Sequence, residues 1–201
     1  MQLSQDDQPP GGLRERKKAR TKTAIQEHAL RLFREQGYDA TTVEQIAEAA
    51  EISPSTFFRY FPTKEDVVVW DDYDPMLIEA IRAQPAGLSP IQAIRGGLRD
   101  AFSRISPADM ARIRERTALM LAVPELRASS MANLSHNLRM IGELVAERVG
   151  REPDDFAVRT FTGAVFGVWL SVLFVWAEDP DADLGTSMDQ GIAQLEAGLP
   201  L

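Results

Sequence analysis

Hydrophobic residues recur with a helical period through residues 42–64, whose sequence is TVEQIAEAAEISPSTFFRYFPTK. In the first part they fall at positions i, i+3, i+4 and i+7, which is one face of an α-helix: Val43, Ile46, Ala47 and Ala50. In the second part Phe57 and Phe61 lie four residues apart on an inward face, with Tyr60 beside them. The opposite face carries Ser55, Phe58 and Arg59. The pattern therefore predicts two short helices, each with one buried face.

A tight turn joins these helices at Glu51, Ile52 and Ser53. Ser53 is a good N-cap and Pro54 suits the first position of the second helix, which Pro62 ends. The position of Glu51 tends toward positive φ, where a residue other than glycine costs on the order of 1 kcal/mol. Two helices joined in this way form a helix-turn-helix, whose second helix lies in the major groove of DNA.

A longer helix is predicted at residues 13–36, because an apolar stripe follows a helical period and Gly37 supplies a left-handed cap. The stripe consists of Ile25, Ala29, Leu32 and Phe33. The first half of this helix contains one acidic residue, Glu15, and a set of basic residues: Arg14, Arg16, Lys17, Lys18, Arg20 and Lys22. Two interpretations of this set stay open: a solvated helix face, or an arm that follows DNA phosphates beside the groove.

Proline and glycine divide the rest of the chain into further helices. We expect them at residues 64–83, with a kink or break near Asp74 and Pro75, and at residues 90–105, 108–122, 125–149, 153–178 and 184–197. The helix at residues 153–178 places Pro153 at its N-terminal end and Asp154 and Asp155 in its first turn. No stretch alternates with a period of two over a useful length, so the predicted fold class is all-α.

Residues 161–177, FTGAVFGVWLSVLFVWA, are apolar on every side of a helix. Such a helix must be covered all round, and this stretch is slightly short of the roughly 20 residues that span a membrane. A stripe of small residues marks one side: Thr160, Gly163, Gly167 and Ser171. We expect one side to pack on the chain's own core and the stripe to meet a second subunit in a homodimer. A membrane span and a core helix within one chain are the alternatives.

The 201-residue chain carries a net charge of −8 and no cysteine. This charge argues against general coating of nucleic acid, whereas a locally basic N-terminal domain is consistent with specific DNA binding. The absence of cysteine excludes disulfides and cysteine zinc sites and is typical of a reducing cytoplasm. We predict a flexible tail at residues 1–12, which lack the apolar segment of a signal peptide, a DNA-binding domain at 13–66 and a larger helical domain at 67–201.

Residues for catalysis or for binding a metal or cofactor are not evident. The two histidines, His28 and His136, lack partners at metal-ligand spacing. Asp71, Asp72 and Asp74 do not match the spacing of a calcium loop, and solvated helix-end carboxylates explain them better. We therefore expect no enzyme, no metal and no cofactor.

Residues 21–68 closely resemble the DNA-binding domain of the TetR family of transcriptional regulators. The likeness rests on a long first helix that ends in LFREQGY, followed by TTVEQIA and then by STFFRYFPTKED. It implies a three-helix domain on DNA and a helical domain for an effector and for dimerisation. By this resemblance, phosphates are held by Thr42, Ser53, Thr56, Tyr60 and Lys64. The complete predicted DNA-binding set is Arg16, Arg20, Thr42, Ser53, Pro54, Ser55, Thr56, Phe58, Arg59, Tyr60 and Lys64.

Three outward residues of the second helix are expected to face base edges: Ser55, Phe58 and Arg59. Phe58 is suited to pack on a thymine methyl, and Arg59 is suited to donate to guanine. A contact from Arg59 to phosphate alone is the alternative that the sequence leaves open.

The resemblance also implies an effector cavity in the helical domain. Methionine and aromatic side chains suit an adaptable apolar pocket, although most of them are expected to be core. The candidate pocket residues are Trp70, Tyr73, Met76, Met110, Ile113, Met120, Met131, Leu134, Phe161 and Trp169. Candidate polar anchors are Arg116, Asn137 and Thr162.

We therefore predict a cytoplasmic homodimeric repressor that binds a palindromic operator in double-stranded DNA and is released by a small apolar effector, with no membrane partner. The helix beginning at Lys64 is the expected moving element, since it starts against DNA and carries Trp70 and Tyr73 toward the helical domain. An activator, a regulator that needs its ligand in order to bind DNA, and a dimeric helical ligand carrier that does not bind DNA are the alternatives.

Overall fold

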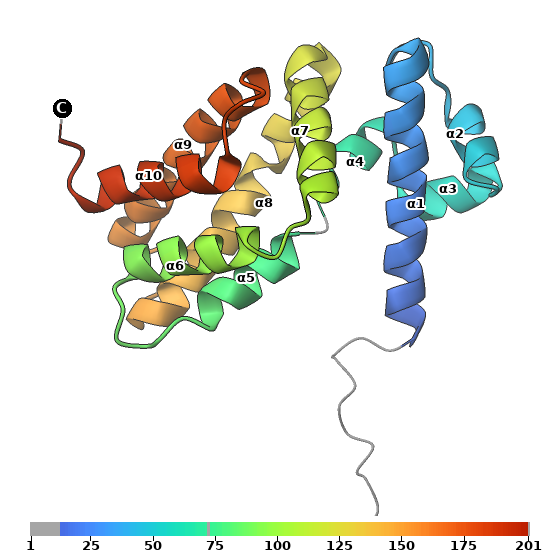
Figure 1. The fold of residues 1–201 in the computed structure, drawn as a ribbon. Helices are drawn as coiled ribbons and strands as arrows, with labels where there is room; N and C mark the ends of the chain where they lie inside the picture. The colour runs from blue at the N-terminus through green and yellow to red at the C-terminus, as the bar shows by residue number, and fades with distance from the viewer. Residues whose placement is uncertain (1–12, 72, 201) are drawn as a thin grey trace, which may run out of the picture. The chain divides into compact units, whose positions relative to one another are not determined.

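The computed structural model describes residues 13–71 and 73–200, except for the side chains of residues 13–16 and 131–133. Within the described residues the chain forms ten α-helices and no strand (Figure 1), which confirms the all-α prediction. The chain divides into two compact units between residues 72 and 73. We call the described part of the first the head unit (residues 13–71) and that of the second the body unit (residues 73–200). The predicted tail, residues 1–12, lies outside the described residues.

The head unit contains four helices: α1 (Leu13–Gln36), α2 (Val43–Ala49), α3 (Pro54–Tyr60) and α4 (Lys64–Val69). Helix α1 packs against α2 and α4, and α2 packs against α3. The core of the head unit contains Ile25, Ala29, Leu30, Phe33, Ile46, Ala47, Phe57, Phe61, Val67 and Val68. Leu30 is buried where the sequence favoured Leu32, which is half-buried.

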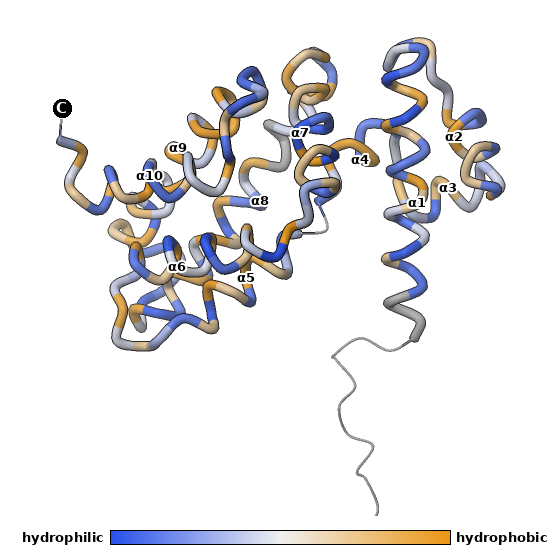
Figure 2. Tube along the Cα trace, viewed as in Figure 1, coloured by the Kyte–Doolittle hydropathy of each residue, from blue (hydrophilic) through white to orange (hydrophobic). Residues whose placement is uncertain are grey.

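Helix α4 belongs to the head unit, whereas the predicted domain boundary separated Val67 and Val68 from it. Both valines have 0% of their surface exposed. Figure 2 shows the second half of α4 as hydrophobic. Helix α4 ends at Val69 and α5 begins at Asp74, so the predicted helix at residues 64–83 is broken and not kinked. A six-residue helix is not stable alone in water, so its burial against α1 is what holds it.

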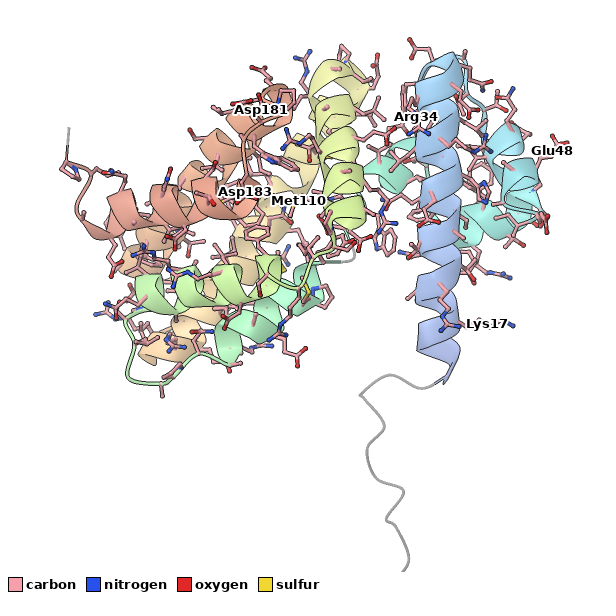
Figure 3. The ribbon with its side chains drawn as sticks, viewed as in Figure 1. Lys17, Arg34, Glu48, Met110, Asp181 and Asp183 are labelled. Carbon is pink, nitrogen blue, oxygen red and sulfur yellow. The ribbon has the colours of Figure 1, made fainter. Side chains whose placement is uncertain are left out.

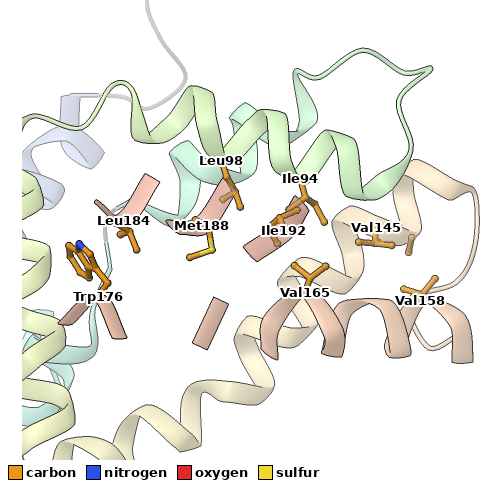
Figure 4. Packing of buried hydrophobic residues seen from close by; sticks show 10 residues of the cluster. Ile94, Leu98, Val145, Val158, Val165, Trp176, Leu184, Met188 and Ile192 are labelled. Carbon is orange, nitrogen blue, oxygen red and sulfur yellow. The ribbon is translucent and has the colours of Figure 1, made fainter. Parts of the chain in front are cut away.

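The body unit contains α5 (Asp74–Arg82), α6 (Pro90–Phe102), α7 (Pro107–Ala122), α8 (Pro124–Val149), α9 (Phe156–Glu178) and α10 (Leu184–Glu196). Helix α9 packs against α7, α8 and α10, and α6 packs against α5 and α10. The buried core lies between these helices (Figure 4) and consists of Ile94, Leu98, Val145, Ala146, Val158, Val165, Trp176, Leu184, Met188 and Ile192.

Two helix ends in the body unit differ from the sequence-based expectation. Helix α9 begins at Phe156 and not at Pro153, since the Asp155 side chain accepts from the backbone N–H groups of Ala157 and Val158 as an N-cap. Helix α6 ends at Phe102 and not at residue 105. The remaining predicted helices in the body unit agree to within one residue.

Ionic contacts join α6 to α10 on the surface of the body unit. The Arg95 guanidinium donates to both carboxylate oxygens of Asp189, at 2.8 and 2.9 Å, and to Glu196 at 3.2 Å. Arg99 donates to Asp189 at 2.7 Å. Hydrogen bonds from Arg95 and Arg99 hold the pKa of the Asp189 carboxyl well below its usual range. The carboxylate therefore stays ionised across the physiological pH range, and the network keeps α10 in register with α6.

Helix α9 has two different faces. Its inward face supplies Val158, Thr162, Val165, Phe166 and Trp176 to the buried interior. All four residues of the predicted stripe, Thr160, Gly163, Gly167 and Ser171, lie on the exposed face. The alternative of a helix fully covered by its own chain is therefore wrong.

Among the described residues, α9 is also the one helix that is long and apolar enough to cross a membrane, and 22% of its apolar window is buried. A core helix of a globular protein satisfies the same criteria.

Gly97 is required where α6 crosses α5. A Cβ atom at this position would lie 2.6 Å from Ile81 Cα and 2.7 Å from Ile81 N, so backbone must move to accept it. We expect Gly97→Ala to destabilise the body unit by about 1–3 kcal/mol through overpacking. Urea unfolding at equilibrium measures this change.

Gly96→Ala is the matched control, because the atoms that its Cβ meets belong to the flexible side chain of Gln84. It should leave the free energy of unfolding unchanged or slightly raised, since alanine favours helix. Equal effects of the two substitutions would contradict the close approach of α5 and α6.

Candidate nucleic-acid interface

Helix α3 presents one face to the head-unit core and the opposite face to solvent. Phe57 has 0% and Phe61 1% of its surface exposed, and their ring centroids lie 6.0 Å apart. Phe58 is 49% exposed, unusually for a large apolar side chain. Ser55 and Arg59 are exposed beside it. The structure thus brings together the three residues predicted to face DNA bases.

Hydroxyl groups cluster at the start of α3. Ser53 is the N-cap and accepts from the backbone N–H of Thr56 at 3.1 Å. Its Oγ also lies 2.9 Å from both Ser55 Oγ and Thr56 Oγ1. Pro54 occupies the first turn, as predicted. These bonds hold the hydroxyls close to the exposed face that carries Phe58.

The end of α3 carries a stacked pair. The Arg59 guanidinium lies over the ring of Tyr60, 5.4 Å from the ring centroid. Stacking on an aromatic face restrains a long, flexible side chain. Arg59 is therefore restrained before any contact with DNA is made.

Glu51 adopts the left-handed conformation that the sequence predicted for the turn, with φ of 54°. The backbone N–H of Glu51 donates to Glu48 O, and that of Ile52 donates to Ala47 O, at 3.0 and 2.9 Å. These two bonds form the Schellman motif that ends α2, in which glycine usually occupies the position of Glu51. The turn geometry is thus kept in spite of an unfavourable residue.

The N-terminus of α2 is closed by a capping box. Thr42 accepts from the Gln45 backbone N–H, and the Gln45 side chain accepts from the Thr42 backbone N–H. Gln36 donates to Gln45 at 2.9 Å and to Thr41 Oγ1 at 3.1 Å, which ties the end of α1 to this cap. Thr42 itself is exposed.

Lys64 makes internal contacts that sequence reasoning missed. Its ammonium group donates to Tyr38 O at 2.9 Å and to Thr41 O at 3.1 Å, and it lies 4.0 Å from the centroid of the Tyr38 ring. A lysine ammonium has three N–H donors. These bonds join the start of α4 to the loop between α1 and α2 and use two of the three donors.

Tyr38 and Glu65 reinforce the same junction. The Tyr38 hydroxyl donates to Glu65 Oε1 at 2.7 Å. Burial alone raises the pKa of the Glu65 carboxyl, but hydrogen bonds from Tyr38 and Thr63 and the charge of Lys64 outweigh burial, so the pKa is lowered overall. Glu65 is therefore an ionised acceptor at neutral pH. These partners lie more than 20 residues apart in sequence and leave no local motif.

The basic residues of α1 divide into two groups. Lys17, Lys18 and Arg20 are exposed, as both interpretations of this helix require. Figure 3 shows Lys17 and Arg34 at opposite ends of α1, and Glu48 on α2. Arg16 was also predicted to contact DNA, but its side chain lies outside the described part of the structure.

Lys22 is the exception, because it lies over the Phe61 and Trp70 rings, 5.0 and 5.2 Å from their centroids. Burial lowers the pKa of its ammonium group, and the charge of Lys18 lowers it further, against an opposing effect of Asp66. Lys22 therefore serves the packing of the head unit.

The predicted pocket residues do not line one hollow. An open hollow of about 710 Å³ in the body unit is lined by Phe102, Ile105, Pro107, Met110, Ala111, Arg114, Glu115, Ala118, Ala177, Pro180 and Asp183. Only Met110 belongs to the predicted set; Figure 3 labels it with Asp183.

Most of the other predicted pocket residues are half-buried within the body unit. Ile113, Phe161 and Trp169 pack against the buried core. The Tyr73 hydroxyl accepts from Arg112 at 3.0 Å. Met76, Met120 and Leu134 are half-buried, and the Met131 side chain lies outside the described part.

Trp70 lies in the head unit, where its ring packs against that of Phe61 with centroids 5.8 Å apart. It therefore belongs to the packing of the head unit, whereas the other predicted pocket residues belong to the body unit. Of the candidate anchors, Arg116 and Thr162 are 8% and 2% exposed, and Asn137 is half-buried.

Comparison with known proteins assigns both units. Residues 25–69 match the family described as bacterial regulatory proteins, tetR family, and residues 88–200 match the MftR C-terminal domain of that family. The regulator TcmR of Streptomyces glaucescens is 36% identical over an alignment 187 residues long, which covers 86% of this chain and 80% of TcmR. MftR of Mycobacterium tuberculosis is 31% identical over 92% of this chain and 93% of its own length. The chain therefore belongs to the TetR family of transcriptional regulators.

Solved structures agree on the fold. The TetR-family repressor FadR of Thermus thermophilus, in complex with lauroyl-CoA, has a TM-score of 0.58 at 24% identity, covering 90% of this chain and 95% of that chain. The repressor NalD of Pseudomonas aeruginosa has a TM-score of 0.59 at 20% identity, covering 91% and 97%. The protein is thus a DNA-binding transcriptional regulator with a helix-turn-helix formed by α2 and α3.

Replacing Glu51 with glycine should stabilise the head unit. Glycine adopts a φ of 54° without the steric cost that a Cβ atom imposes there, so Glu51→Gly is expected to raise the free energy of unfolding by about 1 kcal/mol. Chemical denaturation monitored by circular dichroism measures the change. Glu51→Gln removes the charge but keeps the Cβ atom and should leave stability unchanged. An equal gain from both substitutions would assign the effect to charge and not to backbone strain.

Proposed function

We propose that this protein is a homodimeric repressor that binds a palindromic operator through α3 and is released by a small apolar effector. The observation that supports the DNA-binding face best is the pair of opposed faces on α3, with Phe57 buried and Phe58 and Arg59 exposed. An exposed aromatic ring beside a restrained guanidinium suits a thymine methyl next to a guanine. The protein acts in the cytoplasm.

Phosphate contacts flank this reading face. Thr42, Ser53, Thr56, Tyr60 and Lys64 hold phosphates, and Arg16 and Arg20 on α1 follow the backbone beside the groove. Support comes from the capping bonds, which hold the Ser53 and Thr56 hydroxyls within 2.9 Å of each other, and from the remaining donor on Lys64. Such contacts set orientation and salt dependence, while Arg59 and Phe58 select the sequence.

Two subunits meet through the exposed face of α9. The predicted stripe continues at both ends with exposed phenylalanines, so that exposed residues recur every three or four positions: Phe156, Thr160, Gly163, Gly167, Ser171 and Phe174. A Cβ atom added at Gly163 or Gly167 would meet nothing within 4 Å, which leaves room for a partner helix. A continuous exposed apolar face of this kind is typical of a protein–protein contact.

The effector binds in the body unit. The candidate lining residues are Met131 and the half-buried Tyr73, Met76, Met110, Ile113, Met120, Leu134, Phe161 and Trp169; of these, Met110 borders the hollow described above. These flexible or flat apolar side chains suit a small apolar molecule. Release requires that the effector bind the DNA-free arrangement more tightly, typically by 1–3 kcal/mol.

Selection from a random-sequence duplex library with the full chain tests operator binding. The expected product is a dyad-symmetric site with half-sites about one helical turn apart, or wider. Arg59→Ala should then weaken binding to this site by about 1–3 kcal/mol and relax the preference at one base position per half-site. Titration by fluorescence anisotropy on cognate and scrambled duplexes measures both effects. Equal losses on the two duplexes would show that Arg59 does not read bases.

Enlarging the small-residue stripe should weaken the dimer. Gly167→Leu places a bulky side chain on the face that we assign to the partner subunit, and overpacking of about 1–3 kcal/mol corresponds to a roughly 5- to 150-fold higher dissociation constant. Sedimentation velocity over a range of concentrations measures the association. Gln190→Leu adds the same side chain at an exposed site on α10 and should not change it. A Gly167→Leu protein that associates like the unchanged chain would exclude this interface.

A further inference from the structure

Gln26 lies on the buried side of α1 in the head unit, with 4% of its surface exposed. Its side-chain nitrogen donates to Val67 O at 2.7 Å and to Trp70 O at 2.9 Å, across 41 and 44 residues of sequence. Val67 lies in the last turn of α4, and Trp70 is the residue that caps this helix. One side-chain amide therefore binds two carbonyls at the C-terminal end of α4.

These two carbonyls lie where a helix cannot pair its own groups. The last four carbonyls of an α-helix have no partner within the helix, and a buried one needs a donor from elsewhere. Helix α4 is only six residues long, so its own hydrogen bonds do little to set its direction. The amide of Gln26 supplies the missing donors and at the same time fixes the end of α4 to α1.

The neighbouring contacts act at the same place. Lys22 lies one turn before Gln26 on α1, and its ammonium group covers the rings of Phe61 and Trp70. Val68 has 0% of its surface exposed. Apolar packing holds α4 near α1, but packing alone does not fix a direction, whereas two hydrogen bonds from one planar amide do.

The opposite end of α4 is fixed as well, by different partners. Lys64 donates to the carbonyls of Tyr38 and Thr41, and Glu65 accepts from the Tyr38 hydroxyl. Both ends of α4 are thus joined to the head unit, the first to the loop before α2 and the second to α1. At the second end, the side chain of Gln26 provides the hydrogen bonds from α1 to the carbonyls of Val67 and Trp70.

We propose that Gln26 is a positioning residue for operator recognition, which fixes α4 to α1 so that α3 keeps a set direction relative to the helix that leads to the body unit. This inference rests on the proposed function, in which two heads of one dimer read two half-sites. Without the amide, α1, α2 and α3 stay folded together, but their direction relative to α4 is less fixed. Loss of Gln26 therefore relaxes the preferred distance between half-sites, an effect that a loss of stability alone does not produce.

Hydrogen exchange tests the structural part without DNA. In the unchanged chain, the slowly exchanging amides of α4 should be protected to the same degree as those in the middle of α1. In Gln26→Met, which keeps the length of the side chain but cannot donate, exchange in α4 should become at least tenfold faster while the middle of α1 changes little. Exchange in α4 as fast as in exposed loops of the unchanged chain would overturn the proposal, even if the variant does not fold.

Binding to DNA of altered spacing tests the functional part. The selected operator is compared with versions in which the half-sites are one base pair closer or farther apart. The unchanged chain should prefer the selected spacing, and in Gln26→Met this preference should fall several-fold, together with a roughly tenfold loss of affinity for the selected site. An equal loss at every spacing, or none, overturns the positioning role.

Gln84→Leu and Gln26→Glu complete the design. Gln84 is a matched control in the body unit, since its amide also donates to two acceptors, Ala80 O at 3.3 Å and Asp100 at 2.7 Å, and its loss should leave the spacing preference unchanged. Gln26→Glu keeps the shape of the side chain but turns a donor into an acceptor facing two carbonyls, so it should relax spacing at least as much as Gln26→Met. If selection yields no dyad-symmetric site, the proposed function fails, and hydrogen exchange still decides whether Gln26 fixes α4.

Discussion

The burial of Phe57 on the seven-residue helix α3, and of Phe61 directly after it, is the constraint on which the DNA-facing surface depends. Both rings pack into the core of the head unit. Because an α-helix has 3.6 residues per turn, the side chains of Phe58 and Arg59 then point away from that core. The packing of the head unit therefore determines which side chains of α3 are available to contact DNA. The exposed ring of Phe58 costs free energy in solvent, and a base edge would recover it.

The fold was largely predictable because its signals are local. The apolar spacing, the N-cap at Ser53 and the positive φ at Glu51 each depend on residues close together in sequence. Each appears in the structure as expected. The exposed set on α3 followed from the same periodicity. Gln26 was not predicted to make a long-range contact, because nothing in the sequence shows that its acceptors lie at the end of α4.

What could not be predicted depends on pairs that are distant in sequence. Lys64 and Tyr38 meet across 26 residues, and Trp70 joins the head unit because its ring finds Phe61. From the sequence, the helix beginning at Lys64 was expected to be the element that moves. The structure adds that bonds at both of its ends join α4 to the same packed unit as the helix-turn-helix, so a displacement of α4 would carry α3 with it.

The two faces of α9 connect stability with function. Its inner face closes the body core with Val165 and Trp176, while Phe174 and Val175 remain 48% and 63% exposed on its outer side. Covering an exposed apolar face with a second copy lowers the free energy of the folded state. Association therefore stabilises the fold by mass action. In a homodimer the contact that sets the distance between the two heads would also support the core of each body unit. Substitutions on the outer face of α9 should therefore alter unfolding and operator binding together.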